Sequence, residues 1–163
     1  MTQTATAPRK RRLPTSSQIR IWREYLETSE TIRSRLGSRL QSDSGLSMGD
    51  YQVLLALSEA HNHRFRSSEL AAHITWERSR LSHHLGRMEK RGLIRREPCP
   101  DDSRGADVVL TEQGAEAFRT GSIPHLEAVR ELFIDALSPE QLNQLEGIAK
   151  ALRAHLNQAG KGS

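Results

Sequence analysis

Two short helices followed by two short strands occupy the middle of the sequence, and few folds accommodate that order. The first helix is expected over 67–74 and is followed by Thr75, a suitable N-cap for the second helix. The second helix continues through Arg91 and stops at Gly92, a residue that readily adopts the left-handed conformation found after helices. Two short helices joined by a tight polar turn form the helix-turn-helix arrangement.

A β-hairpin is expected directly after this pair of helices. Residues 93–97 and 106–110 have the composition of strands, and 98–105 between them is rich in Pro, Asp, Ser and Gly. The middle of the chain therefore predicts a small unit of helices with one hairpin.

Longer amphipathic helices surround this unit. Apolar residues recur with helical spacing over 18–41, and Ser47 begins another helix through a capping-box-like pattern. Thr111 caps a helix that is expected to be interrupted near 121–124, and a Ser-Pro pair at 138–139 opens a last helix. The fold class is therefore mainly α with a small β-hairpin.

Composition limits the remaining choices. With 163 residues, 36% of them hydrophobic and 27% charged, the chain is long enough for one domain, which we assign to 18–157. Residues 1–17 and 158–163 are expected to be tails, the first of them flexible and basic. No apolar run approaches the ~18 residues of a membrane span, and no secretory signal is evident. We therefore expect a cytoplasmic protein with no membrane partner.

The formal net charge of +4 is unevenly distributed along the chain. Residues 1–12 and 61–104 each carry a net charge of +4, whereas 13–60 and 105–163 are slightly acidic. The block over 61–104 also holds five of the seven histidines. A localised basic block is typical of a surface that binds a polyanion such as nucleic acid. A solvated charged face is the alternative, and charge alone does not separate the two.

The second of the two short helices carries the clearest candidate binding surface. If Leu81, Leu85 and Met88 form its buried face, the helical period places polar and cationic side chains opposite. Side chains of these kinds contact base edges and phosphates in a DNA major groove. The candidates on and beside this face are Trp76, Ser79, Arg80, Ser82, His83, Arg87 and Lys90. Gly86 shares the face and indicates either close approach of a partner or, as we favour, a tolerated weak point.

The predicted hairpin adds a second candidate contact. Arg104 lies near its tip beside Gly105, where an arginine would enter a narrow DNA minor groove. Asp102 is close enough in sequence to hold the guanidinium or the loop in place. The alternative for this pair is an ordinary surface salt bridge, worth about 0–1 kcal/mol.

Taken together, these segments resemble the MarR family of winged-helix transcription regulators. The resemblance rests on ELA at 69–71, SRLSHHL at 79–85, MEKRGLIRR at 88–96, DSRG at 102–105 and VLTEQG at 109–114. It implies a winged helix-turn-helix DNA-binding lobe over 47–118. Within this lobe it implies a recognition helix over 76–91 and a wing that carries Asp102 and Arg104.

The resemblance also implies a homodimer that binds double-stranded DNA. Residues 18–41 and 119–157 would form interlocking dimerisation helices, and each lobe would read half of a pseudo-palindromic operator. The helices at the chain ends support this independently, because in so small a domain their apolar stripes lack enough partners unless a twofold-related copy covers them.

Family members often release DNA when a small phenolic or lipophilic ligand binds between the dimerisation helices and the DNA-binding lobe. The resemblance makes Trp22, Tyr25 and Tyr51 candidates for lining such a pocket, since aromatic side chains offer apolar contact and a polar group. For any one of them, packing in the core or an interface is the favoured alternative. The identity of a ligand is not readable from the sequence.

Other functional classes have weaker support. Cys99 is the only cysteine, so it forms no internal disulfide and supplies no thiolate zinc site, and it lies far from the position of the reactive cysteine in the family's peroxide sensors. The histidine pairs at 61 and 63 and at 83 and 84 lack further metal ligands of suitable spacing. No catalytic motif or cofactor signature is found, so we expect no enzyme, no metal and no cofactor.

Two hypotheses therefore remain. The first is a sequence-specific homodimeric regulator, and more narrowly a repressor that a small ligand releases. The second is a non-specific architectural DNA-binding protein or a protein-interaction module, which would use the basic faces without reading bases.

Overall fold

The computed structural model describes residues 13–99 and 102–159, with only the backbone described for 102–104 and 159. The N-terminal half holds α1 (Ser16–Ser44), α2 (Met48–Glu59), the short 3-10 helix η1 (His61–His63), β1 (Arg64–Arg66), α3 (Ser67–His73) and α4 (Arg78–Lys90). The C-terminal half holds β2 (Ile94–Cys99), β3 (Asp102–Leu110), α5 (Glu112–Val129), the π-helical segment η2 (Arg130–Ile134) and α6 (Pro139–Ala159). The architecture confirms the predicted class, mainly α with a small sheet and a winged-helix lobe.

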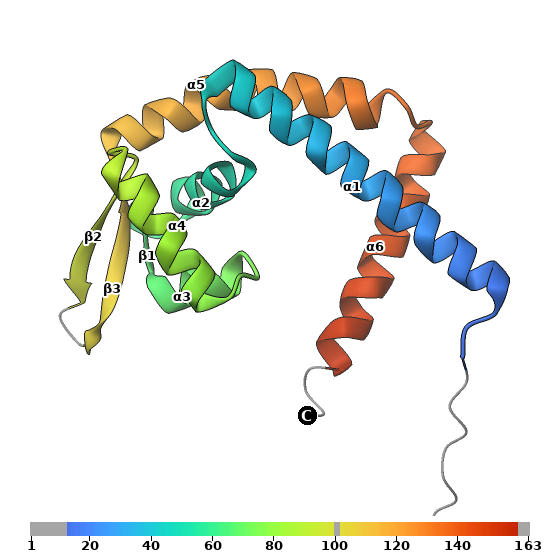
Figure 1. The fold of residues 1–163 in the computed structure, drawn as a ribbon, viewed down its shortest axis with the longest axis horizontal. Helices are drawn as coiled ribbons and strands as arrows, with labels where there is room; N and C mark the ends of the chain where they lie inside the picture. The colour runs from blue at the N-terminus through green and yellow to red at the C-terminus, as the bar shows by residue number, and fades with distance from the viewer. Residues whose placement is uncertain (1–12, 100–101, 160–163) are drawn as a thin grey trace, which may run out of the picture.

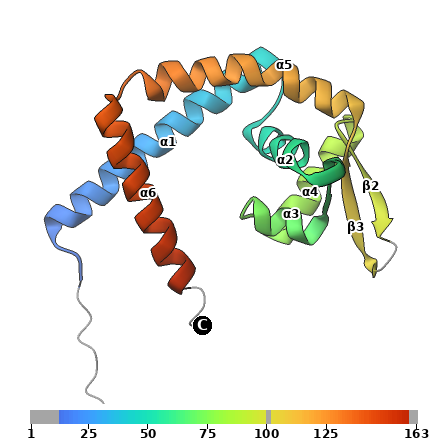
Figure 2. The ribbon, with the colours of Figure 1, turned by 180° about the vertical axis from the view of Figure 1, so that it is seen from behind.

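The molecule has a compact lobe at one end and long helices at the other. Figure 1 shows α2, α3, α4 and the strands gathered in the lobe, while α1 and α5 lie side by side above it and extend away. Seen from behind in Figure 2, α6 turns down from the far end of this helix pair, separated from the lobe. The DNA-binding candidates of α4 and the aromatic residues at the start of α1 are therefore at opposite ends.

The lobe has its own hydrophobic core. Residues from α2, α3, α4 and the strands are buried together, among them Val53, Leu54, Leu57, Leu70, Leu81, Leu85, Met88, Ile94 and Val108. The sheet has the strand order β1-β3-β2 and is antiparallel throughout, with Phe65 and Arg96 both opposite Val108. Strand β1 was not predicted from the sequence. The three-residue segment Arg64–Arg66 is too short to show the alternation typical of a strand. It becomes a strand only by pairing with β3, which is distant in the sequence.

Thr75 closes α3 and does not cap α4, which corrects the prediction from sequence. The N–H of Trp76 donates to the carbonyl of Ala71 at 2.8 Å, and the N–H of Thr75 donates to that of Ala72 at 3.2 Å. With Thr75 at φ +60°, this is the Schellman motif that ends helices. Helix α4 consequently begins at Arg78, after Glu77, and Trp76 precedes it.

Several other predicted helix boundaries are confirmed. Ser47 forms a reciprocal capping box at the start of α2, and Thr111 accepts a hydrogen bond from the N–H of Gly114 at the start of α5. Gly92 follows α4 with φ +74°, as expected for a residue after a helix. The chain ends are more helical than predicted, because α1 begins at residue 16, where a tail was expected, and α6 continues through 159.

The interruption expected near 121–124 does not occur. Helix α5 passes through Pro124 without a break, and Gly121 faces the end of α1. A Cβ at Gly121 would lie 3.1 Å from Cβ of Ser44 and 3.2 Å from Cδ1 of Leu46, so a side chain there would crowd the crossing. The glycine therefore allows two helices to approach, and the turn-forming residues of this segment do not end the helix.

Candidate nucleic-acid interface

Helix α4 has the predicted division between a buried and an exposed face. Leu81, Leu85 and Met88 are buried in the lobe core, whereas its polar candidates lie on the surface. Those exposed candidates are Ser79, Arg80, Ser82, His83 and Arg87. Trp76 is half-buried before the helix begins, and its ring lies 4.1 Å from the guanidinium carbon of Arg80. Trp76 is therefore placed to support an exposed arginine by a cation–π contact, not to project from the recognition helix itself.

The cations of α4 have no acidic partner in the part of the chain that the structure describes. Among the residues that the structure describes, Arg78, Arg80, Arg87 and Lys90 form no ion pair with an acidic side chain. A positive surface without internal counter-ions attracts phosphates and displaces their bound cations. The net charge of the basic block is thus concentrated on the helix predicted to contact DNA.

The arginines of the neighbouring strands behave differently. Arg64 pairs with Glu97 at 2.6 Å and with Asp107 at 3.0 Å, and Arg95 also pairs with Glu97 at 2.6 Å. Hydrogen bonds from Arg95 hold the pKa of Glu97 below its ordinary value, despite some desolvation. These arginines stabilise the sheet as pairs and contribute less free charge than the sequence count indicates.

Glu89 of α4 joins the helix to strand β2 through Arg96. Its carboxylate accepts hydrogen bonds from the side chain of Arg96 at 2.6 and 2.9 Å and from the Arg96 backbone N–H at 2.9 Å. These bonds lower the pKa of Glu89. The hairpin is therefore attached to α4 at a defined position, as the predicted wing would need to be to reach DNA beside the predicted recognition helix.

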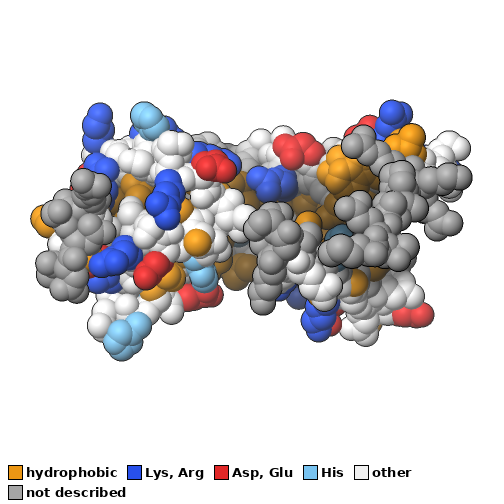
Figure 3. Space-filling view, turned by 90° about the horizontal axis from the view of Figure 1, so that it is seen from below, with side chains coloured by type: hydrophobic (Ala, Val, Ile, Leu, Met, Phe, Trp, Pro, Cys, Tyr) orange, Lys and Arg blue, Asp and Glu red, His pale blue; other side chains and the backbone are white. Residues whose placement is uncertain are grey.

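A cleft lies between α3, α4 and the strands. Three arginines and three serines contribute to its lining: Arg66, Arg78, Arg96, Ser67, Ser68 and Ser82. Guanidinium and hydroxyl groups are the usual donors to phosphate oxygens. Viewed from below in Figure 3, Lys and Arg side chains gather over the lobe end, and hydrophobic side chains form a patch toward the other end.

Asp102 and Arg104 lie in β3, on the outer part of the hairpin, as the wing assignment requires. Their side chains lie outside the described part of the chain, so their predicted contacts stay predictions. The basic residues Arg9 to Arg12 likewise precede the described region. Near the hairpin end the pairing of β2 with β3 is irregular between Pro98 and Cys99.

A buried polar cluster behind α4 was not predicted from the sequence. Asp50, at the start of α2, is only 2% exposed; its Oδ1 lies 3.0 Å from Nε2 of His84 and its Oδ2 lies 2.7 Å from Nη1 of Arg91. His84 is buried and its neighbour His83 is exposed, so the two adjacent histidines have different environments. The helical spacing of 81, 84, 85 and 88 already placed His84 on the buried face, which was the available signal.

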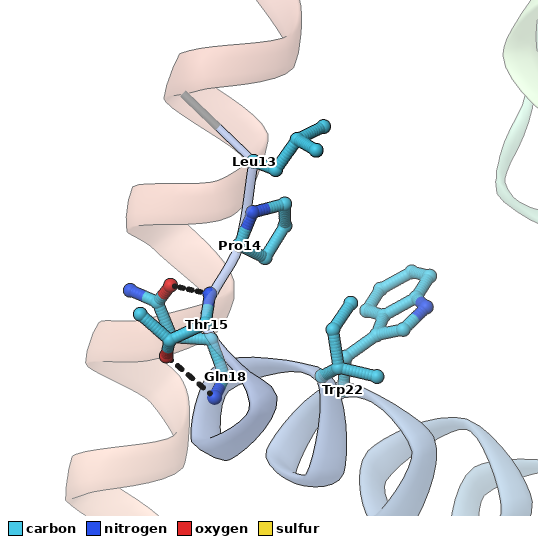
Figure 4. Close-up of a pocket in the computed structure, with 6 residues that line it drawn as sticks. Leu13, Pro14, Thr15, Gln18 and Trp22 are labelled. Carbon is cyan, nitrogen blue, oxygen red and sulfur yellow. Dashed lines mark hydrogen bonds between the residues drawn. The ribbon is translucent and has the colours of Figure 1, made fainter. Parts of the chain in front are cut away.

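The three aromatic residues proposed for a ligand pocket do not line one site in the protomer. Tyr51 is buried in the lobe, with its ring 5.2 Å from that of Phe118 and 4.4 Å from that of His125. Tyr25 lines an apolar groove between α1 and η2. Trp22 lines a separate hollow, shown in Figure 4 beside Leu13, Pro14 and the Thr15–Gln18 capping box. Tyr51 thus belongs to a different region because its side chain fills the core.

Cys99 accepts a hydrogen bond from Nη2 of Arg66 at 3.0 Å and is partly buried. Among the described residues, no group of three or more His, Cys, Asp or Glu side chains is arranged to hold a metal ion. Within the same part of the chain, no helix is long and apolar enough to cross a membrane.

The fold and the exposed α4 surface define a winged-helix protein of the DNA-binding class. A model of the MarR family matches residues 46–105. The chain is 40% identical to AbsC, a MarR family transcriptional regulator from Streptomyces coelicolor; the TM-score is 0.82, and the match covers 91% of this chain and 99% of AbsC. It is 38% identical to Sco3205 of the same organism, solved in complex with DNA; the TM-score is 0.83, with coverage of 90% and 92%.

A curated relative agrees with the structural neighbours. The transcriptional repressor MprA of Escherichia coli (strain K12) is 29% identical over 121 residues, which are 74% of this chain and 68% of MprA. The chain therefore belongs to the MarR family of DNA-binding transcriptional regulators.

Proposed function

We propose that the protein is a homodimeric repressor that binds a pseudo-palindromic operator. The observation that carries the proposal is the exposed face of α4, whose cations have no acidic partner among the described residues although the arginines of the adjacent sheet do. Repression is supported by the function named for MprA, and DNA contact by the DNA complex of Sco3205. Such a regulator would act in the cytoplasm and would need no catalytic centre.

In this proposal α4 enters the major groove. Ser79, Ser82 and His83 offer hydrogen bonds to base edges, while Arg80 and Arg87 contact bases or phosphates. The arginines and serines of the cleft between α3, α4 and the strands would hold backbone phosphates, which sets the position of the helix without reading sequence. The wing with Asp102 and Arg104 would follow the backbone into the adjacent minor groove.

The dimer follows from the apolar surface of the helices outside the lobe. Every exposed large hydrophobic side chain among the described residues lies on α1, α5, η2 or α6, or just before α1. Ile21, Trp22, Tyr25, Ile148, Leu152 and Leu156 belong to this set. An apolar surface of this kind is costly in water and is typical of a permanent interface. A second copy, related by a twofold axis, would cover it and place two lobes on two half-sites.

A selection experiment tests sequence-specific binding. Duplexes bound by the full-length protein are selected from a random library of roughly 30 base pairs, and the best duplex is compared with a scrambled one at moderate salt. We expect a preference of about 10³ or more for the selected duplex. Equal affinity for both would contradict the regulator proposal and favour the architectural or protein-interaction alternative.

Substitutions separate the proposed contacts. Arg104→Ala should weaken binding to selected and scrambled duplexes alike and reduce the salt dependence of binding. It removes a positive charge that contacts the DNA backbone or minor groove. Ser79→Ala or His83→Ala should change base preference in a repeated selection. Arg119→Ala, which removes an exposed arginine of α5, is the matched control. If Arg104→Ala leaves affinity unchanged, the wing assignment is wrong.

Release by a small lipophilic or phenolic ligand is a further part of the proposal. It is supported by the apolar groove between α1 and η2, where Tyr25 lies near Phe133 and Leu145. A panel of substituted phenols is added to the complex with the selected duplex, and at least one should lower DNA affinity. If none does so at concentrations near their solubility, the groove serves only for contact between helices.

A further inference from the structure

We propose that Asp50 and His84 are positioning residues that hold Arg87 for DNA contact. The proposal rests on the proposed function, since it assumes that the exposed face of α4 binds DNA. It assigns a role to two buried side chains that make no contact with DNA themselves. Their effect would be transmitted through a defined chain of side chains from the start of α2 to the surface of α4.

The orientation of the His84 ring follows from its contact with Arg87. Nη2 of Arg87 lies 2.9 Å from Nδ1 of His84. A guanidinium can only donate, so Nδ1 must accept and the ring proton must reside on Nε2. That nitrogen is buried, has no hydrogen bond of good geometry among the described residues, and lies 3.0 Å from Oδ1 of Asp50. The imidazole therefore presents a lone pair to the arginine and its N–H side to the carboxylate.

Asp50 is a fixed anion at the base of this arrangement. Burial alone would raise its pKa, but contacts from His84 and Arg91 and a hydrogen bond from the backbone N–H of Ser47 outweigh burial and lower the pKa well below its usual range. Arg91 also donates to the carbonyl of Gly45 at 2.9 Å, just after α1 ends. The carboxylate thus keeps one position because it is held from α2, from α4 and through Arg91 from the end of α1.

Close packing also restrains the ring of His84. Trp76 meets it edge-on, with ring centroids 5.2 Å apart. Gly49 lies against both rings: a Cβ on it would be 2.9 Å from Cε1 of His84 and 2.8 Å from Cη2 of Trp76. Any side chain at Gly49 would push the rings away. The same Trp76 contacts Arg80, so Arg80 and Arg87 each contact a ring of this cluster.

Restraint of Arg87 before binding should increase DNA affinity. A free arginine loses rotamer freedom when it contacts DNA, and immobilising such a side chain costs about 0.5–1.5 kcal/mol, equivalent to roughly two- to tenfold in affinity. An arginine already held by His84 has lost much of that freedom in the unbound protein. The hydrogen bond leaves the rest of the guanidinium available to an acceptor on DNA, since it uses only one of five donors.

A double-mutant cycle on the full-length protein tests the proposal. Affinity for the selected duplex is measured for His84→Leu, for Arg87→Ala and for the double variant, with thermal unfolding of each to monitor the fold. We expect His84→Leu to weaken binding by roughly two- to tenfold and to have no further effect when Arg87 is already alanine. His84→Gln should retain most of the affinity, because its amide can accept from Arg87 and donate to Asp50.

The outcomes are distinct. Equal losses for His84→Leu in both backgrounds would show a purely structural role and overturn the proposal. An Arg87→Ala variant that binds as well as the parent would also overturn it, while the selected duplex preference would still support the proposed function. If His84→Leu does not fold, His84→Phe provides the same cycle, because it keeps a ring of similar shape and removes the nitrogen that accepts from Arg87. Arg119→Ala remains the charge-matched control.

Discussion

The lobe buries its apolar side chains, whereas the helices at the chain ends expose many of theirs. Six residues of α2 are buried, and α4 buries Leu81, His84, Leu85 and Met88. In contrast, α1 buries only Leu40 over its 29 residues, and the described part of α6 buries none. The lobe can therefore complete a core within one chain, whereas the terminal helices expose their apolar faces.

This contrast indicates how the chain divides its stabilising interactions. Helices in water are marginal without tertiary packing, so in the proposed dimer α6 would be stabilised by contact with the second copy. The charged surface shows the same division: among the described residues the cations of α4 have no acidic partner, whereas the helices outside the lobe contain ion pairs such as Arg39 with Glu131 and Lys150 with Glu146. In the proposed dimer the lobe would contribute the DNA surface, and the terminal helices would contribute the contact between copies.

The largest expected effect comes from placing a charge on α6. Leu152 is 51% exposed in the protomer, and Leu152→Glu should dissociate the dimer. Full burial of a leucine contributes about 1.5–3 kcal/mol, so covering the exposed half in two copies contributes roughly 1.5–3 kcal/mol, or about 10- to 100-fold in dissociation constant, and burial of the new carboxylate adds a further loss. Sedimentation should show a shift from twice the 18.3 kDa chain mass toward a single chain.

A matched substitution on the same helix is the control for this test. Asn143→Glu adds the same charge on the opposite side of α6, where the helical period places it away from the apolar stripe. It should leave the mass unchanged. If both variants stay dimeric, the apolar face of α6 is not part of the interface.

The lobe core should be sensitive to cavities in a different way. Leu54 is fully buried, and Leu54→Ala should lower the free energy of unfolding by about 2–5 kcal/mol. The effect should appear in urea unfolding at fixed protein concentration, with little change in the dissociation constant of the native dimer. A large change in dimerisation with a small change in stability would mean that the two regions are not separate.

Local signals in the sequence predicted much of this fold. The capping pairs at Ser47 and Ser138, the Gly92 stop and the buried stripe of α4 depend on neighbours within a few residues. The site candidates on the exposed face of α4 follow from the same helical period. Such features were predictable because the interactions that fix them are local.

The features that were missed depend on distant partners. Strand β1 exists because β3 pairs with it, and the segment of α5 that was expected to break packs through Gly121 on the end of α1. Thr75 is the exception, because the motif that ends α3 is local: its backbone completes the end of α3, where a cap of α4 was expected. The Asp50–His84 pair joins two helices that are adjacent only in the folded lobe. A single sequence does not show which of its buried-face polar residues will meet.

A smaller effect is expected at Gly86 in the middle of α4. A Cβ there would meet no atom within 4 Å, so alanine fits the protomer. Gly86→Ala should raise the free energy of unfolding by about 1 kcal/mol, the usual cost of glycine in a helix. DNA affinity for the selected duplex should be unchanged. A stabilised variant with weaker binding would instead show that DNA approaches the helix backbone at this point.

The smallest effect at neutral pH is expected at His125, which lies where α5 covers the lobe. Its Nδ1 is buried and has no hydrogen-bond partner among the described residues, and burial lowers its pKa. Below its ordinary pKa of about 6.5, the unfolded chain binds a proton that the folded protein does not, so stability should fall as the pH falls. Asp50 does not contribute in this range, because its lowered pKa keeps it ionised in the folded protein and its contribution is lost only at much lower pH.

His125→Phe should remove this acid-dependent loss while keeping the ring that packs on Tyr51. The measurement is the free energy of urea unfolding at about pH 7.5 and about pH 5.5, compared with His155→Phe, which changes an exposed histidine of α6. We expect the two variants to differ little at the higher pH, where an unfolded histidine is also neutral. At the lower pH the His125 variant should be the more stable. If the free energy of unfolding falls equally in both variants at the lower pH, the contact between α5 and the lobe tolerates a charged imidazole. Water would then reach the boundary between the two regions more readily than the structure indicates.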